Sequence, residues 1–566
     1  MSLKSSSNWI FPKKELKGDI VEFVLQSRGI DKENFLNDSL DSIPNFEKLY
    51  DTKRAAKDIV EAVKEKRKIV IHGDFDADGI CSVSILWEFL FKEVSEILDI
   101  GVDVVPYIPS RVDQGYGLTD SSIKDVIELG GELLISVDCG VRDEELINQY
   151  LKDDKLKFVI TDHHQPPEDF NDDLEYPLVH PMYPNHEYPS QEVCGTFVTF
   201  LLIQAIKAEL GVGYEITKET KGLDLVAMAT VTDLMPLLGV NRVVVKYGLD
   251  QMKKRERAGL DELVKVSGIE LNDIDSYHLG YILGPRINAA GRIGSPLDAV
   301  KLLVSEKREF CKGIANILNE TNFERQYMTQ RGLDEAIDII GDSEEKLLFV
   351  VGDDWHEGIV GLIAGKLNEK YYKPVLVATR SKDGVRGSAR SIEGFNVTNA
   401  LSKCDKYLER YGGHELAAGF TIKETKEKEF AKCIHKISDE MITDEMLTKD
   451  IHIDLLLERE DIDKELVGKI DLLKPFGYGN RKPLIAIKEL VVVKKRIMGK
   501  LNNHMKLICK GTGIDLITLV MFNCEDDVEE IEIDDIIDVV GGVGINSWNG
   551  TETVQFLVKE WRPSTS

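Results

Sequence analysis

A histidine and three acids lie close together at His72, Asp74, Asp76 and Asp78, within the sequence HGDFDADG. Clustered carboxylates repel one another unless cations compensate for their charge. Oxygen ligands combined with an imidazole suit Mn²⁺ or Mg²⁺, whereas zinc sites favour cysteine and histidine. The simpler interpretation is a turn followed by a helix N-cap, which accounts for any one of these acids but not for all of them together with His72.

More acids and histidines follow apolar segments later in the chain. Asp138 ends the segment LLISVD, and Asp233 ends ATVTD. Asp162 ends KFVITD and is followed directly by His163 and His164. Each acid alone could be a cap, but together they could hold two cations that share a carboxylate. Two metals about 3.5–4 Å apart can activate a water and stabilise an in-line displacement, so the predicted chemistry is hydrolysis of a phosphoester or phosphoanhydride.

Apolar strands that alternate with helices must position these residues. Residues 68–73, 133–138 and 157–162 are predicted strands, and residues 80–90 and 144–151 are predicted helices. This alternation predicts a parallel sheet that helices cover on both faces. Ligands of such sheets bind beyond the carboxyl ends of the strands, which is where the acids and histidines occur.

The second half of the chain changes in pattern. A segment without proline, from residue 300 to 340, predicts a long connecting helix, and residues 347–380 resume the strand–helix–strand pattern. The last hundred residues contain short apolar segments at close spacing, which predict a small antiparallel barrel. We interpret the first fifty residues, which are polar and mixed in period, as a short helical lead-in.

The composition excludes several classes of protein. A chain of 566 residues allows roughly three to four domains. No segment approaches the ~18 apolar residues of a membrane helix, and the start lacks a secretion signal, so we expect a cytoplasmic protein. Eight cysteines without a CxxC pair argue against a disulfide framework and a zinc site. The net charge of −28 by itself disfavours a protein that coats nucleic acid.

The segments HGDFDADG, SVDCG, TDHH and ATVTD resemble, in order, the four motifs of the DHH phosphoesterase superfamily. Later segments such as GPRINAAGR, NFER, WHEGIVGL, GSARS, YGGHELAAGF and PFGYGN are similar to the RecJ family of bacterial single-strand-specific exonucleases. The resemblance extends from about residue 50 to residue 563. It implies an α/β protein with a lead-in at 1–50, a DHH catalytic domain at 51–300, a connecting helix at 301–343, a DHHA1 substrate-binding domain at 344–450 and an OB-fold at 451–563.

The resemblance also implies roles for the site residues. Two Mn²⁺ or Mg²⁺ ions are expected, with Asp138 as the bridging carboxylate. The implied metal ligands are His72, Asp76, Asp78, Asp138, His163 and Asp233. The implied catalytic residues are His164, Asp138 and Asp74. His164 would face the scissile phosphate, and Asp74 would orient the metal ligands without binding the metal itself.

Further residues are expected to hold the substrate. The forked guanidinium of arginine suits phosphate oxygens, with a structural ion pair as the alternative. The GSARS loop suits a terminal phosphate, and the GGH segment resembles a DHHA1 loop that holds substrate near the metals; its alternative is a helix C-cap. Arg111 beside Tyr116 suits phosphate contact and base stacking. The candidate substrate-binding residues are Arg111, Tyr116, Arg286, Asn288, Arg292, Ser388, Arg390, Ser391, Gly412, Gly413 and His414.

One position departs from the family pattern. Family members usually read G-x-G-R-S where this chain has Ala389 in GSARS. The additional methyl group would either narrow a phosphate pocket or have no effect, depending on the backbone φ angle.

Basic residues of the predicted barrel could follow a nucleic-acid backbone. The candidate groove residues are Lys494, Lys495, Arg496, Lys500 and Lys506. The alternative is a charged edge strand that resists aggregation. Residues 372–423 carry nine basic and five acidic residues, a local charge of +4. We therefore expect a narrow basic path on an acidic body, which would admit one threaded strand.

The leading hypothesis is a metal-dependent 5′–3′ exonuclease that releases mononucleotides from single-stranded DNA, in DNA repair and recombination. One alternative is a DHH hydrolase of short oligonucleotides, cyclic dinucleotides or pyrophosphate, although such proteins generally lack the barrel. Another is a non-catalytic replication scaffold, which the complete set of ligand positions disfavours. We expect 5′-phosphorylated DNA as substrate, a single-strand-binding protein and a helicase as candidate partners, no membrane contact, and a monomer.

Overall fold

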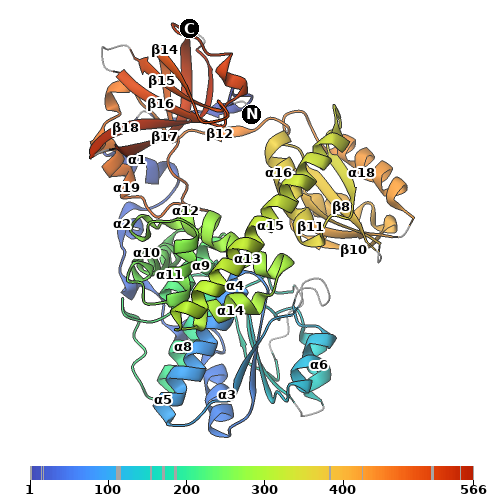
Figure 1. Cartoon of the computed structure of the whole chain (residues 1–566). Coiled ribbons are helices and arrows are strands. Elements are labelled where there is room, and N and C mark those ends of the chain that lie inside the picture. Colours follow the sequence, from blue (N-terminus) through green and yellow to red (C-terminus); the bar gives the residue numbers. More distant parts are fainter. Residues whose placement is uncertain are drawn as a thin grey trace.

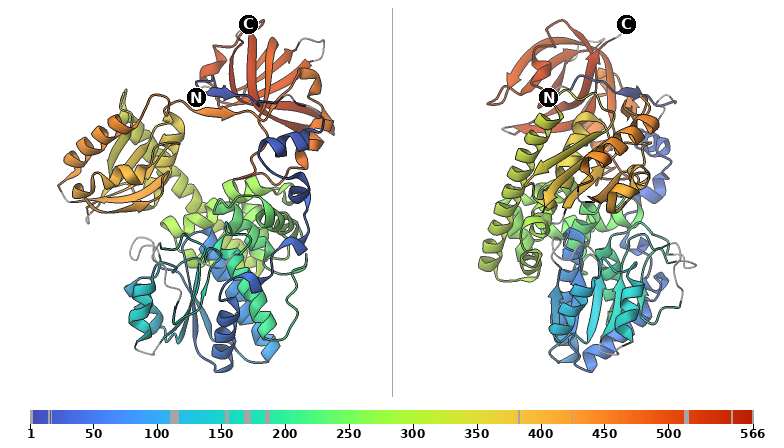
Figure 2. Two further views of the ribbon diagram at one scale, coloured as in Figure 1. Left: turned by 180° about the vertical axis from the view of Figure 1, so that it is seen from behind. Right: turned by 90° about the vertical axis from the view of Figure 1, so that its right-hand side faces the viewer.

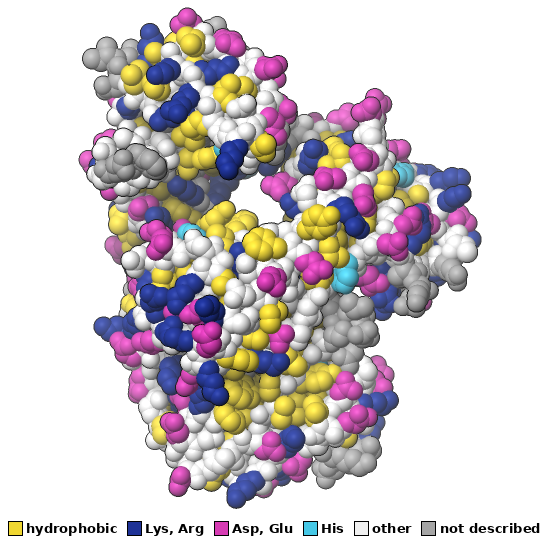
Figure 3. Space-filling model, viewed as in Figure 1, with side chains coloured by type: hydrophobic (Ala, Val, Ile, Leu, Met, Phe, Trp, Pro, Cys, Tyr) yellow, Lys and Arg dark blue, Asp and Glu magenta, His cyan; other side chains and the backbone are white. Residues whose placement is uncertain are grey.

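The structure is a computed structural model, and it describes residues 3–14, 16, 18–109, 117–152, 156–167, 173–183, 188–381, 384–423, 425–511, 516–548 and 550–564. Three folded parts surround a central opening: a large α/β domain, a smaller α/β domain and a barrel (Figures 1 and 3). No helix in the described part of the chain is long and apolar enough to cross a membrane.

The large domain is built on a parallel sheet, as the alternating pattern predicts. Its strand order is β3-β2-β4-β5-β6. The strands are β2 (Ile69–Gly73), β3 (Val104–Tyr107), β4 (Leu133–Val137), β5 (Lys157–Thr161) and β6 (Leu178–Val179). In register, Gly73 pairs with Val137, and Val137 pairs with Thr161. The residues that follow these three strands therefore emerge side by side at one edge of the sheet.

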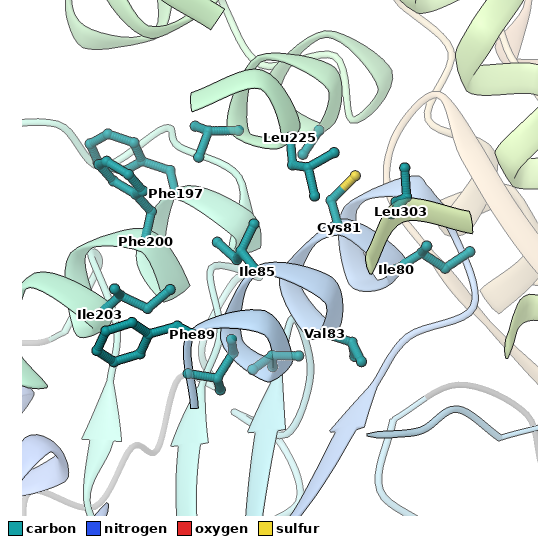
Figure 4. Close-up of a cluster of buried hydrophobic side chains, with 14 of the residues drawn as sticks. Ile80, Cys81, Val83, Ile85, Phe89, Phe197, Phe200, Ile203, Leu225 and Leu303 are labelled. Carbon is teal, nitrogen blue, oxygen red and sulfur yellow. The ribbon is translucent and has the colours of Figure 1, made fainter. Parts of the chain in front are cut away.

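Helices bury the sheet on both sides. Helices α3 (Thr52–Lys64), α4 (Ala77–Glu88) and α8 (Gly195–Glu209) cover one face, and α6 (Asp120–Glu128) and α7 (Glu144–Leu151) cover the other. Helices α9 (Leu223–Thr232), α10 (Gly239–Lys253) and α11 (Ala258–Val266) lie farther from the sheet, where α9 packs on α4, α8 and α10. Helix α4 is buried from Ala77 to Leu86, and its apolar side chains pack against those of α8 and α9 (Figure 4). Helix α4 corresponds to the helix predicted at residues 80–90.

The connecting helix begins later than predicted. Residues 284–304 form two short helices, α13 (Gly284–Ile293) and α14 (Pro296–Val304). The long helix α15 then spans Arg308–Ile340 and leads to the smaller domain. Helix α14 belongs to the large domain. Its apolar side chains Val300, Leu302 and Leu303 are buried in the core of that domain, where α14 packs on α4.

The smaller domain contains a five-stranded sheet of order β10-β11-β9-β8-β7. Its strands are β7 (Leu348–Asp353), β8 (Val375–Ser381), β9 (Gly384–Arg390), β10 (Leu408–Gly413) and β11 (Ala417–Ile422), with helices α16 (Glu357–Tyr371), α17 (Val397–Ser402) and α18 (Glu427–Met441). The predicted strand–helix–strand unit is β7, α16 and β8. The GSARS segment, predicted as a loop, instead lies mostly on strand β9.

The smaller domain contains a disulfide that the sequence did not predict. The cysteine pattern argued against a disulfide framework, and the structure has a single bond among the described residues, between Cys404 and Cys433, with Cα atoms 6.1 Å apart. Packing of α17 against α18 brings together cysteines that are 29 residues apart in sequence, which no local motif reveals. The other six cysteines are free and buried.

The last part of the chain is a barrel. Its strands are β13 (Leu455–Leu456), β14 (Ile485–Met498), β15 (His504–Lys510), β16 (Leu516–Phe522), β17 (Ile536–Trp548) and β18 (Thr551–Pro563). Pairing of β14 with β17 closes the barrel. The sequence predicted an antiparallel barrel, but the barrel is mixed, because β16 pairs with β18 in parallel.

The first fifty residues contain helices, but they are not a separate lead-in. Strand β1 (Asn8–Ile10) pairs with β12 (Asp450–His452) beside the barrel, and Figure 2 shows this segment along the barrel in both views. Helices α1 (Ile20–Ser27) and α2 (Lys32–Leu36) bury Val24, Leu25 and Phe35 in the barrel core. The spacing of Val21, Val24 and Leu25 marks an apolar helix face, but it does not reveal that this face packs on a barrel more than 400 residues later in the chain.

Candidate metal-dependent active site

Three acids meet at the carboxyl edge of the parallel sheet. Because the ends of β2, β4 and β5 are in register, Asp74, Asp138 and Asp162 follow them in a row. All three are buried. The sequence predicted this convergence, since parallel strands place their carboxyl ends at one edge.

The first turn of α4 carries two further acids. One carboxylate oxygen of Asp76 accepts hydrogen bonds from the backbone N–H groups of Asp78 and Gly79, at 2.9 and 3.1 Å, and so caps the helix. The carboxylate of Asp78 accepts from the N–H groups of Gly195 and Thr196, each at 2.7 Å. The start of α8 therefore fixes Asp78, and its positive dipole end stabilises the negative charge.

His163 lies at the centre of the acids. Its Nε2 is 3.1 Å from Asp138 Oδ1, 3.5 Å from Asp233 Oδ2 and 3.6 Å from Asp78 Oδ2. Asp233 reaches the site from the carboxyl end of α9, which is a helix rather than a strand. These contacts join residues from four separate segments of the chain.

Asp138 belongs to two groups of potential metal ligands. One group is Asp74, Asp76 and Asp138, and another is Asp138, His163 and His164; a third, Asp78, His163 and Asp233, adjoins them. Within each group the ligand atoms lie within 4.8 Å of one another. Burial, and then the charges of Asp78, Asp76 and Asp233, raises the pKa of the Asp138 carboxyl well above its usual range. Cations would relieve this repulsion.

His72 lies beneath the acids at the end of β2 and is fully buried. Among the described residues its Nε2 has no hydrogen-bond partner. Burial lowers the pKa of His72 to about 4, so its imidazole is neutral at physiological pH. A neutral imidazole is the form that binds a metal, and an unpaired buried nitrogen suits that role.

Asp162 is a site residue that the sequence placed at a strand end but to which the resemblance gave no role. Its carboxylate accepts hydrogen bonds from the N–H groups of Val141, His163 and His164, and its Oδ1 is 2.8 Å from His164 Nδ1. Burial lowers the pKa of His164, but the hydrogen bond and charge of Asp162 outweigh it and raise the pKa to about 9. The strand-terminal position of Asp162 was the only available signal.

These residues fit a pair of divalent cations. The donors are carboxylate oxygens with imidazole nitrogens, and the set includes three buried atoms without a hydrogen-bond partner in the described part of the chain, His72 Nε2, His163 Nε2 and Asp233 Oδ2. Such donors suit Mn²⁺ or Mg²⁺. Together the residues could support hydrolysis at phosphorus, as predicted from their types.

The residues of GPRINAAGR lie on α13, which packs against α4, α15 and α16. Asn288 Oδ1 accepts from the N–H of Ala77, so this residue supports the first turn of α4. Arg286 is buried against α15, where its Nε donates to Asn319 Oδ1. Arg292 donates to the carbonyl of Gly358 at 3.2 Å and joins α13 to α16 of the smaller domain.

The GSARS residues divide between the two faces of β9. Ser388 and Arg390 lie together over Gly361 of α16, and Arg390 Nη1 donates to Ser388 Oγ at 3.0 Å. The Ser391 hydroxyl is buried and donates to the carbonyl of Phe395, so it is turned away from this face. Ala389 is fully buried in the domain core. Its methyl group therefore does not narrow the face that carries Ser388 and Arg390.

The GGH residues lie at the end of strand β10. Residues 408–413 are a strand, so the alternative of a helix C-cap is wrong. Gly413 has φ +151°, and a Cβ there would lie 2.3 Å from the Ala417 carbonyl oxygen. His414 is exposed in the turn to β11, where its N–H donates to the carbonyl of Ala417. Arg111 and Tyr116 lie outside the described residues.

The barrel lysines do not all share one face. Strand pairing places Arg496 opposite Lys506, and Lys494 lies on the same side of β14 because alternate residues share a face. Lys495 lies on the other side, where it donates to the Ile531 carbonyl and pairs with Glu532. Lys500 is in the following turn. Lys495 therefore does not share the face of β14 that carries Lys494 and Arg496.

Comparisons with known proteins agree with this arrangement. Three family models match the chain: the DHH family N-terminal domain at residues 68–230, the DHHA1 domain at 344–441 and the RecJ OB domain at 453–560. Most of the residues gathered at the sheet edge fall within the first of these ranges.

The chain aligns with similar proteins over most of its length. It is 34% identical over 512 residues to a single-stranded-DNA-specific exonuclease RecJ of Bacillus subtilis, covering 90% of this chain and 63% of that protein. It is 29% identical to the Haemophilus influenzae protein of the same name, covering 96% of each chain. RecJ from Thermus thermophilus in complex with Mn²⁺ has the same fold, with a TM-score of 0.82 at 24% identity over 99% of this chain and 80% of that one. A structure of exonuclease RecJ bound to manganese matches with a TM-score of 0.59 at 28% identity, covering 70% and 96% of the two chains.

Proposed function

The chain belongs to the RecJ family, and we propose that it is a metal-dependent exonuclease that hydrolyses single-stranded DNA. The observation that carries this proposal is the shared position of Asp138 between two groups of potential ligands. A carboxylate so placed can bridge two cations. The RecJ relatives named as single-stranded-DNA-specific exonucleases support this substrate.

We assign the metal-binding role to six residues, as the motif resemblance implies. They are His72, Asp76, Asp78, Asp138, His163 and Asp233. Divalent ions bound there would activate a water and neutralise charge on the phosphate oxygens. The chain itself supplies the fixed carboxylates, through the N-terminus of α8 that holds Asp78 and the in-register strands that align Asp74 with Asp138.

His164 is the residue placed to act on the phosphate. Its side chain is 41% exposed, whereas that of His163 is 7% exposed, so His164 faces outward from the ligand cluster. The carboxylate of Asp162 behind it holds the imidazole in place and favours its protonated form. A protonated imidazole can donate to a phosphate oxygen as negative charge develops in the transition state.

Other parts of the chain are assigned to holding the strand. We propose that Ser388 and Arg390 receive a 5′-phosphate, that the barrel face with Lys494, Arg496 and Lys506 follows the backbone, and that cleavage proceeds from the 5′ end to mononucleotides. The catalytic, substrate-binding and barrel roles then belong to residues 51–300, 344–450 and 451–563. A cytoplasmic monomer acting with a single-strand-binding protein and a helicase in DNA repair would fit this activity.

The test is a time course on single strands labelled at either end, with Mn²⁺ and Mg²⁺ compared. A 5′-labelled strand should release labelled mononucleotide from the first time point, while a 3′-labelled strand shortens gradually. Asp138→Ala should abolish cleavage and leave some DNA binding; full turnover by this variant would contradict the metal site. Faster cleavage of dinucleotides than of a 5′-phosphorylated forty-residue strand would instead indicate a hydrolase of short substrates.

A further inference from the structure

A buried histidine to which the proposed site gives no role contacts the loop that carries His164. His180 follows the edge strand β6 and is 1% exposed. Its Nε2 lies 2.8 Å from the carbonyl oxygen of His164, and its Nδ1 accepts a hydrogen bond from the N–H of Met182 at 3.0 Å. The three groups of potential metal ligands do not include His180.

Strand pairing brings His180 to this loop. The parallel strands β5 and β6 end together, with Thr161 paired to Val179. The N–H of Asp162 then donates to the Val179 carbonyl at 3.2 Å. The residues that follow the two strands therefore run side by side, so the His180 side chain meets the backbone of the loop at residues 162–165.

The two hydrogen bonds define the form of the His180 ring. A carbonyl oxygen only accepts and a backbone N–H only donates, so Nε2 carries the proton and Nδ1 carries none. The imidazole is therefore neutral, and backbone groups occupy both of its nitrogens. A metal ligand or a proton-transfer group needs a free nitrogen. His180 is thus suited to holding the backbone rather than to either of those roles.

Three hydrogen bonds hold His164 in one orientation. Its N–H donates to Asp162 Oδ1 at 3.1 Å, its Nδ1 lies 2.8 Å from the same oxygen, and its carbonyl accepts from His180. The N–H and the carbonyl belong to the two peptide planes that meet at the Cα atom, so fixing both planes fixes the direction of the side chain. Asp162 holds the first plane, and His180 holds the second.

The neighbouring His163 has supports of its own. Its N–H donates to Asp162 Oδ1 at 2.7 Å. Its Nε2 lies within 3.6 Å of carboxylate oxygens of Asp78, Asp138 and Asp233. The side chain of His163 is 7% exposed, whereas that of His164 is 41% exposed. Loss of the bond from His180 should therefore free His164 while His163 stays in place.

We propose that His180 is a positioning residue, which holds the carbonyl of His164 and so aims the His164 imidazole at the scissile phosphate. This inference rests on the proposed function. A donor that is fixed before the reaction stabilises developing charge without a cost of reorganisation. His180 would supply that fixation from behind the site without touching the substrate.

The first test is steady-state cleavage of a 5′-phosphorylated forty-residue strand with Mn²⁺. His180→Phe keeps a buried ring but loses the donor, so kcat should fall about 10- to 100-fold while KM and Mn²⁺ affinity stay unchanged. His180→Gln should keep most of kcat, because its amide can donate to the His164 carbonyl and accept from Met182. The matched control is His435→Phe on α18 of the smaller domain, which should leave kcat unchanged.

A double-mutant cycle tests whether the effect passes through His164. In a His164→Ala background, His180→Phe should cause no further loss of kcat, because no imidazole remains to be aimed. A further loss as large as that in the wild-type background would overturn the inference. So would a loss of Mn²⁺ affinity as large as the loss of kcat, since His180 would then support the metal ligands in general.

Hydrogen exchange of the full chain, measured by mass spectrometry in EDTA, observes the loop without cleavage. Peptides that contain residues 162–167 should exchange faster in His180→Phe than in the wild type and return toward the wild-type rate in His180→Gln. Peptides of the barrel strand β15 should not change. If circular dichroism shows His180→Phe to be unfolded, His180→Gln decides: retained kcat supports the inference, and lost kcat with wild-type exchange contradicts it.

The outcomes separate this inference from the proposed function. Cleavage by the wild-type chain together with an equal kcat of folded His180→Phe would overturn the role of His180 and leave the exonuclease intact. If the wild-type chain did not cleave DNA, the proposed function would fail, and hydrogen exchange would still decide whether His180 fixes the loop. Faster exchange in His180→Phe would support that role, and unchanged exchange would overturn it.

Discussion

At the scale of single residues, the site depends on close approach between backbone and carboxylate. Asp138 adopts a left-handed backbone conformation with φ +64°, which is costly for a residue other than glycine. A Cβ at Gly195 would lie 2.5 Å from Asp138 Oδ1. Gly195 also donates its N–H to Asp78. One glycine therefore leaves room for the Asp138 carboxylate, which is proposed to bridge the cations, and positions a second proposed ligand.

We predict that Gly195→Ala weakens metal binding about 10- to 100-fold, as loss of support for metal ligands typically does. The new methyl group would displace the Asp138 carboxylate. Isothermal titration with Mn²⁺ measures the change. The matched control is Gly313→Ala, since a Cβ at Gly313, within α15, would have no neighbouring atom within 4 Å, and this change should leave Mn²⁺ affinity unaltered. Equal affinities for the wild type and Gly195→Ala would contradict the prediction.

A second prediction concerns pH. The pKa of His164 in the folded chain is raised to about 9 by Asp162, against the effect of burial. A raised pKa means that protonated His164 stabilises the folded state fully below its ordinary pKa of about 6.5, and that this stabilisation is lost as the pH rises toward 9. In EDTA, urea unfolding should therefore show that His164→Gln costs more stability at pH 6 than at pH 9.5. A pH-independent difference would exclude this role for the Asp162–His164 pair.

At the scale of elements, helix α15 decides how the two α/β domains are placed. Its N-terminal half packs on α11, α13 and α14, and its C-terminal half packs on α16 and β7. Trp355 Nε1 donates to Glu335 Oε2 at 2.7 Å and ties the smaller domain to this helix. The distance between the proposed metal site and the face with Ser388 and Arg390 therefore depends on this continuous helix and on the contact of α13 with α16 beside it.

We predict that Gln326→Pro reduces exonuclease activity on long strands without reducing Mn²⁺ affinity. Gln326 is exposed in the middle of α15, and proline there removes a backbone hydrogen bond and bends the helix at a cost of about 3 kcal/mol. Small-angle scattering should detect the altered domain placement. Gln326→Ala serves as the control, and unchanged activity of the proline variant would show that a rigid connection is not required.

At the scale of the whole molecule, the N-terminal segment joins the barrel to the large domain. Asp38, which follows α2 on the barrel side, forms an ion pair with Arg242 of α10. Arg242 is buried, donates to the carbonyls of Leu472 and Lys474, and lies over the ring of Phe35. Arg242 is thus one of the contacts that close the ring of three parts, together with the ion pair of Lys246 with Asp38. The net charge of −28 is spread over this body, while the barrel keeps a cationic face.

The cationic face of the barrel predicts how DNA binding depends on salt concentration. Despite the net charge of −28, the logarithm of affinity should fall with the logarithm of salt concentration, because phosphate contacts release counterions. Lys494→Gln and Lys506→Gln should each reduce the slope by about 0.7. Lys495→Gln is the control, since Lys495 pairs with Glu532 on the other side of the strand. A wild-type slope near zero would contradict a basic path.

Local patterns in the sequence determined the chemistry and its position. The acids after three apolar strands predicted both a cation site and the sheet edge where it lies, because residue types and the strand period are local properties. The structure brings Asp74, Asp138, His163 and Asp233 to that edge, and His72 lies at the end of the strand that precedes Asp74. The long helix and the second strand–helix–strand unit were likewise readable from local periodicity.

Only the tertiary structure decided which residues support these ligands and which face one another. Several of these contacts join residues far apart in sequence. They are the hydrogen bonds from the start of α8 to Asp78, the Cys404–Cys433 disulfide and the packing of the first helices on the barrel. The turning of Ser391 and Lys495 away from their expected partners depended on strand register. Such contacts are set by the packing of whole elements, which no short segment encodes, whereas the chemical nature of the ligands is carried by each residue alone.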